Sequence, residues 1–273
     1  MSWRVRLARW IPAAEPLGIR PRQLNFRTHL HPFPICSIPC PGIKLLTLRR
    51  DSQSCRRPAM VKAIIFDLDS CLAAADEVGQ ELFAPAFAAI RAANDGSVSG
   101  EKLQQAFSEC WRVAFDAIAE KYHFTQAMRD AGWKIFRETE VTKPMRGYDD
   151  LHLLKQLAPV KLFLVTSGFR RLQESKVRAL GFADWFVSLH IDAIDEPDRR
   201  GKFGIFQTLI ATHGLRLSEV LVVGDNPDSE IEAGNRLGMA TIQILRPGVP
   251  QSERAHRHIR GLEELKIILQ SWK

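Results

Sequence analysis

Two aspartates spaced by one residue follow a short apolar run in this chain of 273 residues. The run, residues 61–66, is rich in β-branched and aromatic side chains, which is typical of a buried strand in a parallel sheet. Asp67 and Asp69 come directly after it. Because α/β folds bind ligands at the carboxyl ends of their strands, we expect both carboxylates at an active-site edge. Taken alone, the same spacing also fits a turn or a helix cap.

Polar residues follow a second predicted strand in the same way. Thr166, Ser167 and Gly168 come after the apolar run 160–165, at the point where a helix is expected to begin. The hydroxyls and the free main-chain N–H groups of such a turn can bind phosphate oxygens. A plain N-cap of the following helix is the alternative interpretation.

A further carboxylate follows the apolar run 220–223. Asp225 comes just after that predicted strand, and Asp228 and Glu230 lie in the next segment. The latter two acids could contact a metal or simply be favourable first-turn residues of a helix. Lys202, which opens another predicted helix, would add an ammonium group near the same edge.

The elements that would position these groups alternate along the chain. Strand-like runs recur with helical segments between most of them, and several of these segments are followed by a glycine that suits a helix end. This alternation predicts an α/β fold with a doubly wound parallel sheet. The predicted strands are 61–66, 160–165, 185–190, 220–223 and 240–245, and the predicted helices are 172–180, 203–213, 229–237 and 262–272.

The interval between the first two predicted strands, about ninety residues, is far longer than a crossover connection needs. It contains three apolar stripes at helical spacing, and Thr125 is a suitable N-cap for the third. We therefore predict a small helical domain over residues 75–145, inserted into a core of residues 61–74 and 146–273. The stripes are Phe83, Phe87 and Ile90; Leu103, Phe107 and Trp111; and Met128, Trp133 and Phe136, all expected in the core of that domain.

The net charge of +7 does not indicate a nucleic-acid or membrane partner once it is divided along the chain. Residues 1–60 carry 11 Lys and Arg against two acids, whereas the remainder carries 27 basic and 29 acidic residues. The first sixty residues also hold 8 of the 15 prolines and show no sustained helical or strand period. We expect a largely disordered basic extension there. It could precede a true start at Met60, form a targeting segment, or act as a basic binding arm.

The cysteine count and the hydropathy of the sequence indicate in which cellular compartment the protein is expected. The five His and Cys residues between positions 29 and 55 match no common zinc-finger spacing, so no zinc site is expected there. The two remaining cysteines are too few for a disulfide framework, which favours a reducing compartment and a cytoplasmic location. No window approaches 18 consecutive apolar residues, so we expect no membrane span.

Taken together, the polar groups at the strand ends resemble, in type and order, the motifs of the haloacid dehalogenase-like (HAD) hydrolase superfamily. These groups are Asp67-x-Asp69, Thr166-Ser167, Lys202 and Gly224-Asp225. The resemblance covers residues 61 to about 271, and the helical insertion looks like the cap of the phosphatase branches of that superfamily. It implies a Rossmann-like core in which the 220–223 strand lies beside the 61–66 strand, so that Asp225 lies next to Asp67.

The sequence departs from the commonest family pattern at Ser70-Cys71, where Gly-Thr is usual. We expect Cys71 to be a small buried neighbour rather than a nucleophile. This departure from the family pattern affects the packing of the side chains behind Asp69.

The resemblance and the charges point to a magnesium site. Two carboxylates about 4 Å apart at an effective dielectric near 20 repel by roughly 4 kcal/mol, so such a pair holds a proton unless a cation compensates it. Mg²⁺ suits a site that offers one or two carboxylates, waters and a phosphate oxygen. By resemblance, Asp67, Asp225 and the main-chain carbonyl of Asp69 would bind Mg²⁺, with Glu230 or Asp228 in support, directly or through water.

The resemblance also implies a phosphatase mechanism. Asp67 would attack phosphorus and form an aspartyl-phosphate, while Asp69 would protonate the leaving oxygen and later activate water. Lys202 would neutralise the phosphate. The groups expected around the transferring phosphate are Thr166, Ser167, Gly168 and the main-chain amides near Leu68 and Asp69.

The predicted substrate is a small phosphorylated metabolite, whose identity the sequence does not indicate. Arg170 or Arg171 could grip a second anionic group, although a solvated helix face explains the same residues. A phosphomutase of the same superfamily and a non-catalytic phosphometabolite-binding protein are the alternative functions, and Asp69 argues against a dehalogenase. The oligomeric state is not indicated.

Overall fold

The computed structural model of the protein describes residues 60–271. The expectations for the basic extension before Met60, including the rejected zinc site, lie outside the described residues. Among the helices of residues 60–271, none combines the length and the apolar character that a bilayer crossing requires.

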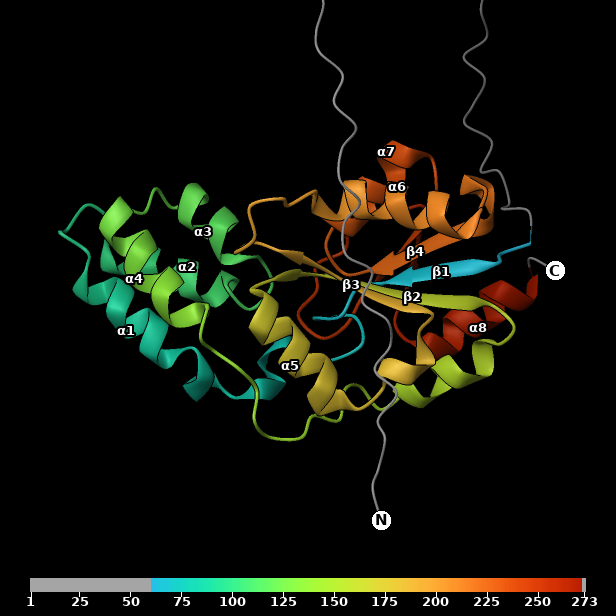
Figure 1. Ribbon diagram of the computed structural model, residues 1–273, viewed down its shortest axis with the longest axis horizontal. Helices are drawn as coiled ribbons and strands as arrows, with labels where there is room; N and C mark the ends of the chain where they lie inside the picture. Colours follow the sequence, from blue (N-terminus) through green and yellow to red (C-terminus); the bar gives the residue numbers. More distant parts are fainter. Residues whose placement is uncertain (1–59, 272–273) are drawn as a thin grey trace, which may run out of the picture. The chain divides into compact units, whose positions relative to one another are not determined.

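A six-stranded, entirely parallel sheet forms the centre of the fold (Figure 1). The strand order is β3-β2-β1-β4-β5-β6. The strands β2 and β3 therefore lie on one side of β1, and the later strands β4, β5 and β6 lie on its other side. This confirms the predicted doubly wound α/β fold. The strands are β1 (Ala63–Phe66), β2 (Lys161–Gly168), β3 (Ser188–Ala193), β4 (Val220–Gly224), β5 (Ala240–Ile244) and β6 (Arg257–Ile259).

Helices cover both faces of the sheet because its strands are apolar on both sides. One face carries α5 (Arg170–Leu180), α8 (Leu262–Ser271) and the 3-10 helix η3 (Leu151–Leu157); α6 (Gly201–His213) and α7 (Glu230–Leu237) cover the other (Figure 1). Short 3-10 turns η4 (Ala183–Trp185) and η5 (Leu217–Glu219) precede β3 and β4. Gly181, Gly214 and Gly238 end α5, α6 and α7 in the left-handed conformation, as predicted.

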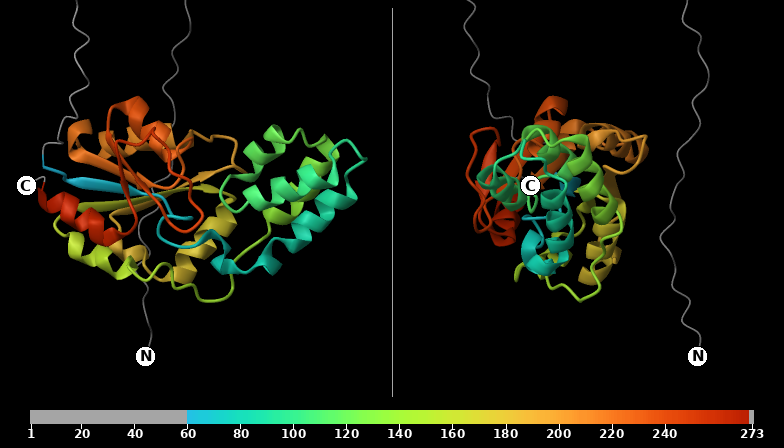
Figure 2. Two further views of the ribbon diagram at one scale, coloured as in Figure 1. Left: turned by 180° about the vertical axis from the view of Figure 1, so that it is seen from behind. Right: turned by 90° about the vertical axis from the view of Figure 1, so that its left-hand side faces the viewer.

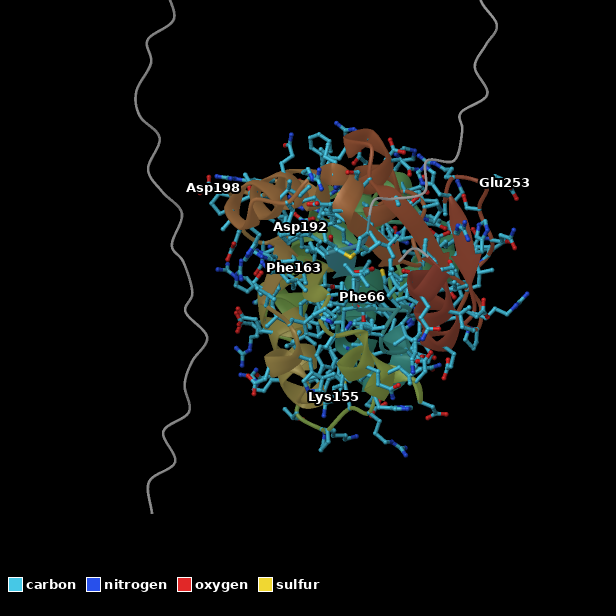
Figure 3. The ribbon with its side chains drawn as sticks, turned by 90° about the vertical axis from the view of Figure 1, so that its right-hand side faces the viewer. Phe66, Lys155, Phe163, Asp192, Asp198 and Glu253 are labelled. Carbon is cyan, nitrogen blue, oxygen red and sulfur yellow. The ribbon has the colours of Figure 1, made fainter. Side chains whose placement is uncertain are left out.

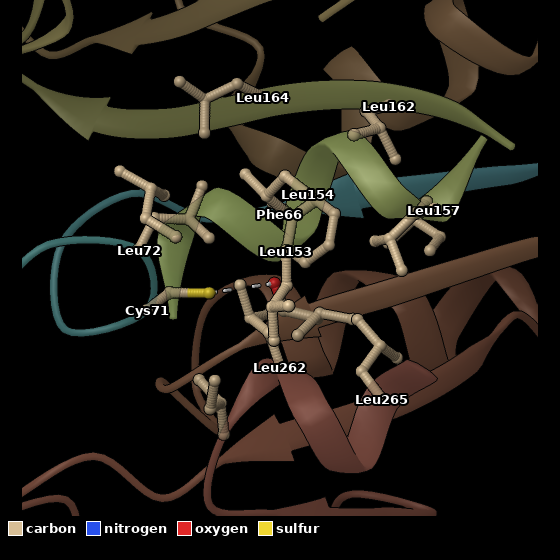
Figure 4. Close-up of a cluster of buried hydrophobic side chains, with 14 of the residues drawn as sticks. Phe66, Cys71, Leu72, Leu153, Leu154, Leu157, Leu162, Leu164, Leu262 and Leu265 are labelled. Atoms are coloured by element: carbon tan, nitrogen blue, oxygen red, sulfur yellow. Dashed lines mark hydrogen bonds between the residues drawn. The ribbon is translucent and has the colours of Figure 1, made fainter. Parts of the chain in front are cut away.

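Alternate residues of each strand point into two different cores, since side chains along a strand alternate between faces. Phe66 packs with the leucines of η3 and α8 on one face (Figure 4). Phe163 packs with Phe206 and Leu209 of α6 on the other. Both phenylalanines lie in the interior of the described chain, whereas charged residues such as Asp198 and Glu253 lie at its periphery (Figure 3).

Four α-helices between β1 and β2 lie together on the side to which the strands point (Figures 1 and 2). We call residues 75–136 the helical insert. Its aromatic side chains form a separate core, which also takes in Phe169, Leu172 and Ile194 from the sheet domain. The elements of the insert are η1 (Ala75–Val78), η2 (Gln80–Leu82), α1 (Ala84–Ala92), α2 (Gly100–Glu109), α3 (Phe115–Lys121) and α4 (Gln126–Phe136).

The structure adds or shifts a few elements. The short edge strand β6 and the seven-residue helix α3 were not predicted. β2 runs to Gly168, three residues beyond the predicted strand end, and β3 begins at Ser188 rather than at position 185 because a 3-10 turn occupies the start of that run. Thr125 caps α4 as expected, since its side chain accepts a hydrogen bond from the Met128 N–H.

Candidate active site

Three buried carboxylates meet where two central strands end. β1 pairs with β4 through Phe66 and Val223, so Asp67 and Asp225, which follow these strands, lie at neighbouring strand ends. Glu230, in the first turn of α7, completes the group, and its members offer oxygens within 4.8 Å of one another. The adjacency of Asp67 and Asp225 that the resemblance implied is therefore present.

A buried lysine lies against two of these carboxylates. The Lys202 Nζ is 2.8 Å from Asp67 Oδ1 and 2.7 Å from Glu230 Oε2. The first turn of α6, which begins at Gly201, delivers this ammonium group to the cluster. Burial would lower the pKa of Lys202, but the carboxylates of Asp67 and Glu230 outweigh it and raise the pKa well above its usual range. Lys202 is therefore a permanent cation at this site.

The position of Glu230 depends on the absence of a side chain at Gly224. A Cβ built at Gly224 would lie 2.2 Å from Glu230 Oε1 and 2.4 Å from its Cγ. The same Oε1 accepts a hydrogen bond of 2.7 Å from the Asn226 N–H. Asp228 lies outside the carboxylate cluster: its side chain is 79% exposed and pairs with Arg254. Of the two acids predicted in support, the structure thus places Glu230 with the strand-end aspartates.

Burial and mutual repulsion raise the pKa values in the cluster. Burial is the largest effect at Asp67, Lys202 offsets part of it, and the pKa rises to about 7. The pKa of Asp225 rises to about 8, chiefly because the residue is buried and then because Glu230 and Asp67 lie nearby. Arg112, from the helical insert, places Nη2 3.3 Å from Asp225 Oδ2 and offsets a further part. The carboxylates still outnumber the cations that face them.

The donor set fits a hard divalent cation. Carboxylate oxygens are the ligands that Mg²⁺ and Ca²⁺ prefer, whereas zinc and copper sites use imidazole or thiolate. A divalent cation would also supply the positive charge whose shortage raises the pKa values of Asp67 and Asp225. Both Glu230 oxygens already accept hydrogen bonds, from Lys202 and from Asn226. Asp67 and Asp225 are therefore the principal candidates for direct ligands.

The side chain of Asp69 is held by two residues of α5. Lys176 Nζ lies 2.7 Å from Asp69 Oδ1 and 2.8 Å from Oδ2. Gln173 Nε2 donates to the same carboxylate, at 3.1 Å from Oδ2. Both α5 residues are only 3% exposed. Asp69 thus lies apart from the three-carboxylate cluster, with its own buried cation.

The two predicted hydroxyl groups at the end of β2 have different partners, and only that of Thr166 contacts a residue that holds Asp69. Thr166 Oγ1 donates to Gln173 Oε1 at 3.3 Å, and Ser167 Oγ donates to Asp192 Oδ2 at 3.0 Å. Gly168 has a φ of 149°, and a Cβ there would lie 2.7 Å from Gln173 Nε2. These residues extend the strand rather than cap α5, whose N-cap Phe169 makes no side-chain hydrogen bond.

The turn after β1 is tight and buried. The carbonyl oxygen of Leu68 accepts hydrogen bonds from the N–H groups of Cys71, Leu72 and Ala73. Ser70 has a φ of 54°, a left-handed conformation that glycine adopts at lower cost than serine. Cys71 is fully buried and its Sγ lies 3.7 Å from the Val223 carbonyl oxygen (Figure 4). Burial raises the pKa of Cys71, so its thiol stays protonated, in keeping with the predicted packing role.

The two arginines after Gly168 pair with glutamates outside the carboxylate cluster. Arg170 pairs with Glu196 and Glu174, and Arg171 pairs with Glu138 and Glu140. Neither arginine lines the cavity next to the carboxylates. Binding of a substrate anion by either of them stays a prediction.

A cavity of about 400 Å³ joins the strand ends to the helical insert. Residues at the strand ends line one part of it, and the helical insert lines another part with aromatic side chains and with the charged residues Glu109, Arg112 and Lys121. The polar lining includes Asp67, Asp69, Thr166, Lys176, Arg199 and Lys202, and the aromatic lining includes Phe83, Trp111, Phe115, Phe136 and Phe169. The site is therefore open to a small molecule that bears both polar and apolar groups.

Sequence reasoning missed Gln173, Lys176 and Arg112. The first two are polar residues on an otherwise amphipathic helix, where such side chains usually face solvent. Their spacing of three residues places them on one face of α5, but only the tertiary structure shows that this face meets Asp69. Arg112 lies in a turn after α2 with no local pattern to distinguish it.

The chain belongs to the haloacid dehalogenase-like hydrolase family, whose profile matches residues 61–238. Hydrolases of this family generally use a divalent metal, and the buried carboxylate cluster is the group in residues 60–271 that suits one.

Curated relatives and solved structures agree with that assignment. The chain is 27% identical over 204 residues to a glyceraldehyde 3-phosphate phosphatase of Methanopyrus kandleri, covering 68% of this chain and 85% of the relative. It is 24% identical over 235 residues to the N-acylneuraminate-9-phosphatase of Mus musculus, covering 77% and 94%. A HAD phosphatase of Thermococcus onnurineus has a similar fold, with a TM-score of 0.52 and 20% identity over 77% of this chain and 98% of that one.

Proposed function

We propose that the protein is a Mg²⁺-dependent phosphatase that hydrolyses a small phosphorylated metabolite through an aspartyl-phosphate at Asp67. The observation that carries the proposal is the position of Asp67: it lines a cavity, in contact with the buried Lys202 and beside Asp225 and Glu230. The family and the phosphatases among the relatives support the same activity.

The metal would be held by Asp67, Asp225 and the main-chain carbonyl of Asp69, with Glu230 in support through water. When bound, it would supply positive charge for the cluster and for the phosphate oxygens. Glu230 would also hold Lys202 in place, because its Oε2 lies 2.7 Å from the ammonium group. Lys202 would then be shared between Asp67 and an incoming phosphate.

The chain's own residues account for both half-reactions. Asp67 attacks phosphorus, the bond from phosphorus to the ester oxygen breaks, and that oxygen leaves with a proton from Asp69. A water then attacks the aspartyl-phosphate and gives its proton to Asp69, while the carboxylate of Asp67 is regenerated. Lys202 and the main-chain amides near Leu68 and Asp69 stabilise the negative charge on the transferring group, and Thr166, whose proton is donated to Gln173, lies against that group.

The helical insert would act as a cap that selects the substrate. It supplies both aromatic and charged side chains to the lining of the cavity, next to the strand ends. The cavity of about 400 Å³ limits the substrate to a small metabolite. Glyceraldehyde 3-phosphate and N-acylneuraminate 9-phosphate, the substrates named for two relatives, are the first compounds to test.

A phosphatase screen of the full chain tests the proposal. Phosphate release would be measured over a panel of metabolites that includes these two esters and para-nitrophenyl phosphate, with Mg²⁺ and with a chelator. We expect release that requires Mg²⁺ and that is abolished in Asp67→Asn. Magnesium-dependent activity that persists in Asp67→Asn would overturn the nucleophile assignment, and a wild-type protein that releases no phosphate would overturn the phosphatase assignment. A protein that returns the phosphate to its product would be a phosphomutase instead.

A further inference from the structure

A buried lysine outside the family motifs contacts the second aspartate of the site. Lys176 is 3% exposed, yet its Nζ lies within 2.8 Å of both oxygens of Asp69. A lysine loses much hydration free energy when buried, and the contacts of Nζ with both oxygens of Asp69 offset that loss. Lys176 also lines the cavity, which places the pair at the reacting end of the site.

Gln173 links this pair to the end of β2. Its Nε2 donates to Asp69 Oδ2 and to the Ser167 carbonyl oxygen, and its Oε1 accepts from Thr166 Oγ1. Every polar atom of its amide is thereby engaged, which fixes its orientation. Gly168 provides the room for Gln173, since a Cβ there would lie 2.7 Å from Nε2. Gln173 and Lys176, which lie three residues apart on one face of α5, thus both donate hydrogen bonds to the carboxylate of Asp69.

We infer that Lys176 is a positioning residue that holds the carboxylate of Asp69 in the orientation needed to take a proton from water. The inference rests on the proposed function. In the second half-reaction the water oxygen bonds to phosphorus and the bond from phosphorus to Asp67 breaks. The bonding pair returns to the Asp67 carboxylate, and the water's proton goes to Asp69. The contacts with Lys176 and Gln173 fix the carboxylate that receives this proton.

The inference separates Lys176 from Lys202, although both are buried lysines paired with an aspartate. Lys202 faces Asp67 and Glu230 and would contact the phosphate itself. Lys176 faces Asp69 and acts through it. Loss of Lys176 should therefore slow hydrolysis of the aspartyl-phosphate while leaving its formation from an activated ester nearly intact.

Pre-steady-state kinetics with para-nitrophenyl phosphate would test this. Nitrophenolate leaves without needing a proton, so formation of the aspartyl-phosphate does not depend on Asp69. For Lys176→Met we expect a rapid burst of about one nitrophenolate per active site, followed by steady turnover about 100-fold slower than in wild type. Acid quenching should trap phosphate on Asp67, and Lys176→Arg should recover most of the turnover. A burst slowed as much as the steady rate, or a Lys176→Met turnover within twofold of wild type, would overturn the inference.

A double-mutant cycle separates positioning from a merely structural role. If Lys176 acts through Asp69, adding Lys176→Met to Asp69→Asn should change turnover by no more than about twofold, because the interaction has already been lost. A structural defect would lower turnover again in the double variant and would overturn the inference. Lys155→Met, which removes an exposed lysine of η3, is the control and should turn over like wild type.

The two proposals fail in different ways. A wild-type protein that releases no phosphate from any ester overturns the phosphatase assignment and this inference with it. An active wild type whose Asp67→Asn variant is inactive supports the phosphatase assignment, and the kinetics of Lys176→Met then decide the role of Lys176 alone.

Discussion

At the scale of single residues, the site is an excess of buried negative charge held by a few fixed cations. Asp67, Asp225 and Glu230 lie together, and within the described residues the side-chain cations in direct contact with them are Lys202 and Arg112. Such a cluster is unfavourable without a ligand and favourable with one, since a bound cation restores the balance. Cation binding to this cluster should therefore raise the free energy of unfolding of the protein.

Removing the charge of Lys202 should abolish most activity without unfolding the protein. Lys202→Met keeps the length of the side chain but leaves Asp67 and the substrate phosphate without a fixed cation. We expect turnover to fall by about 100- to 1,000-fold, the usual effect of losing one such electrostatic contact. Circular dichroism should show a native fold, and near-normal turnover would show that Lys202 does not contact the transferring group.

The metal-free protein should lose stability as the pH rises. The folded pKa values of Asp67 and Asp225, about 7 and about 8, lie above the unfolded value of about 3.9. At pH values between the unfolded and the folded pKa, each carboxyl group is ionised in the unfolded chain but still protonated in the folded protein. Each group then lowers the free energy of unfolding by at most about 1.4 kcal/mol per pH unit. The effect is absent below pH 4 and complete above pH 8.

Thermal unfolding between pH 5 and pH 8.5 in a chelator measures this decline. Asp225→Asn cannot ionise at that position, so its curve should fall less steeply than that of wild type. Saturating Mg²⁺ should flatten the wild-type curve as well. A metal-free wild type that is as stable at pH 8 as at pH 5 would show that the carboxylates are not linked to folding.

The residues of the candidate site differed in how far the sequence predicted them. Asp67, Asp69 and Asp225 follow apolar strands, and the ends of parallel strands lie at one edge of a sheet, so the pattern placed all three at that edge. The adjacency of Asp67 and Asp225 was predicted from the family resemblance and not from the pattern. Lys176 and Gln173 lie on a helix whose orientation about its axis depends on packing. No local pattern distinguishes a polar residue that faces solvent from one that faces a buried carboxylate.

At the scale of elements, the strand β4 and the helix α7 together position the side chain of Glu230. The strand delivers Asp225 and ends at Gly224, and the helix begins at Glu230. The glutamate side chain folds back over the glycine and reaches Lys202. A side chain at position 224 would occupy the space that this arrangement requires.

Gly224→Ala should therefore disrupt the cluster. The added methyl group would overlap Glu230 Oε1, so the carboxylate must leave its place beside Lys202. We expect a loss of about 1–3 kcal/mol in the free energy of unfolding, together with weaker Mg²⁺ binding measured by calorimetry. The matched control is Gly100→Ala, where a Cβ meets no atom within 4 Å. Equal Mg²⁺ affinities in the two variants would argue against a role for Glu230 near the metal.

Element prediction succeeded where burial imposes a pattern and failed where it does not. The central strands are apolar on both faces and were all predicted. β6 is a three-residue edge strand with the sequence Arg-His-Ile, which offers no apolar run. The seven-residue helix α3 is too short to show a helical period. Its Phe115 and Ile118 belong to the core of the helical insert, where Phe115 contacts the rings of Trp133 and Phe136 in α4. Tertiary contacts, rather than local preference, stabilise both elements.

At the scale of the whole described chain, one buried ion pair joins segments that are far apart in sequence. Arg246, after β5, donates to both oxygens of Asp150 at 2.8 Å and to the Cys71 carbonyl oxygen at 3.0 Å. Asp150 also accepts from the N–H of Leu262, where α8 begins. The guanidinium stacks 4.2 Å from the centre of the Tyr148 ring. The pair thus anchors the turn that follows Asp67 and Asp69 to the last helix.

Breaking this pair should destabilise the protein more than any surface change. Arg246→Met leaves the Asp150 carboxylate buried without its cation, which costs about 3–5 kcal/mol in comparable buried pairs.

Burial opposes ionisation of Asp150, but the hydrogen bonds from Arg246 and Leu262 outweigh it and lower the pKa of Asp150. A folded pKa below the unfolded value of about 3.9 means that the pair stabilises the protein above that pH and ceases to do so as the pH falls through the folded pKa. Urea unfolding should show a large deficit for Arg246→Met at pH 7 that shrinks below pH 4, and Asp150→Leu added to Arg246→Met should recover part of it at pH 7. A deficit of the same size at both pH values would mean that Arg246 stabilises the fold by packing on Tyr148 rather than by its charge.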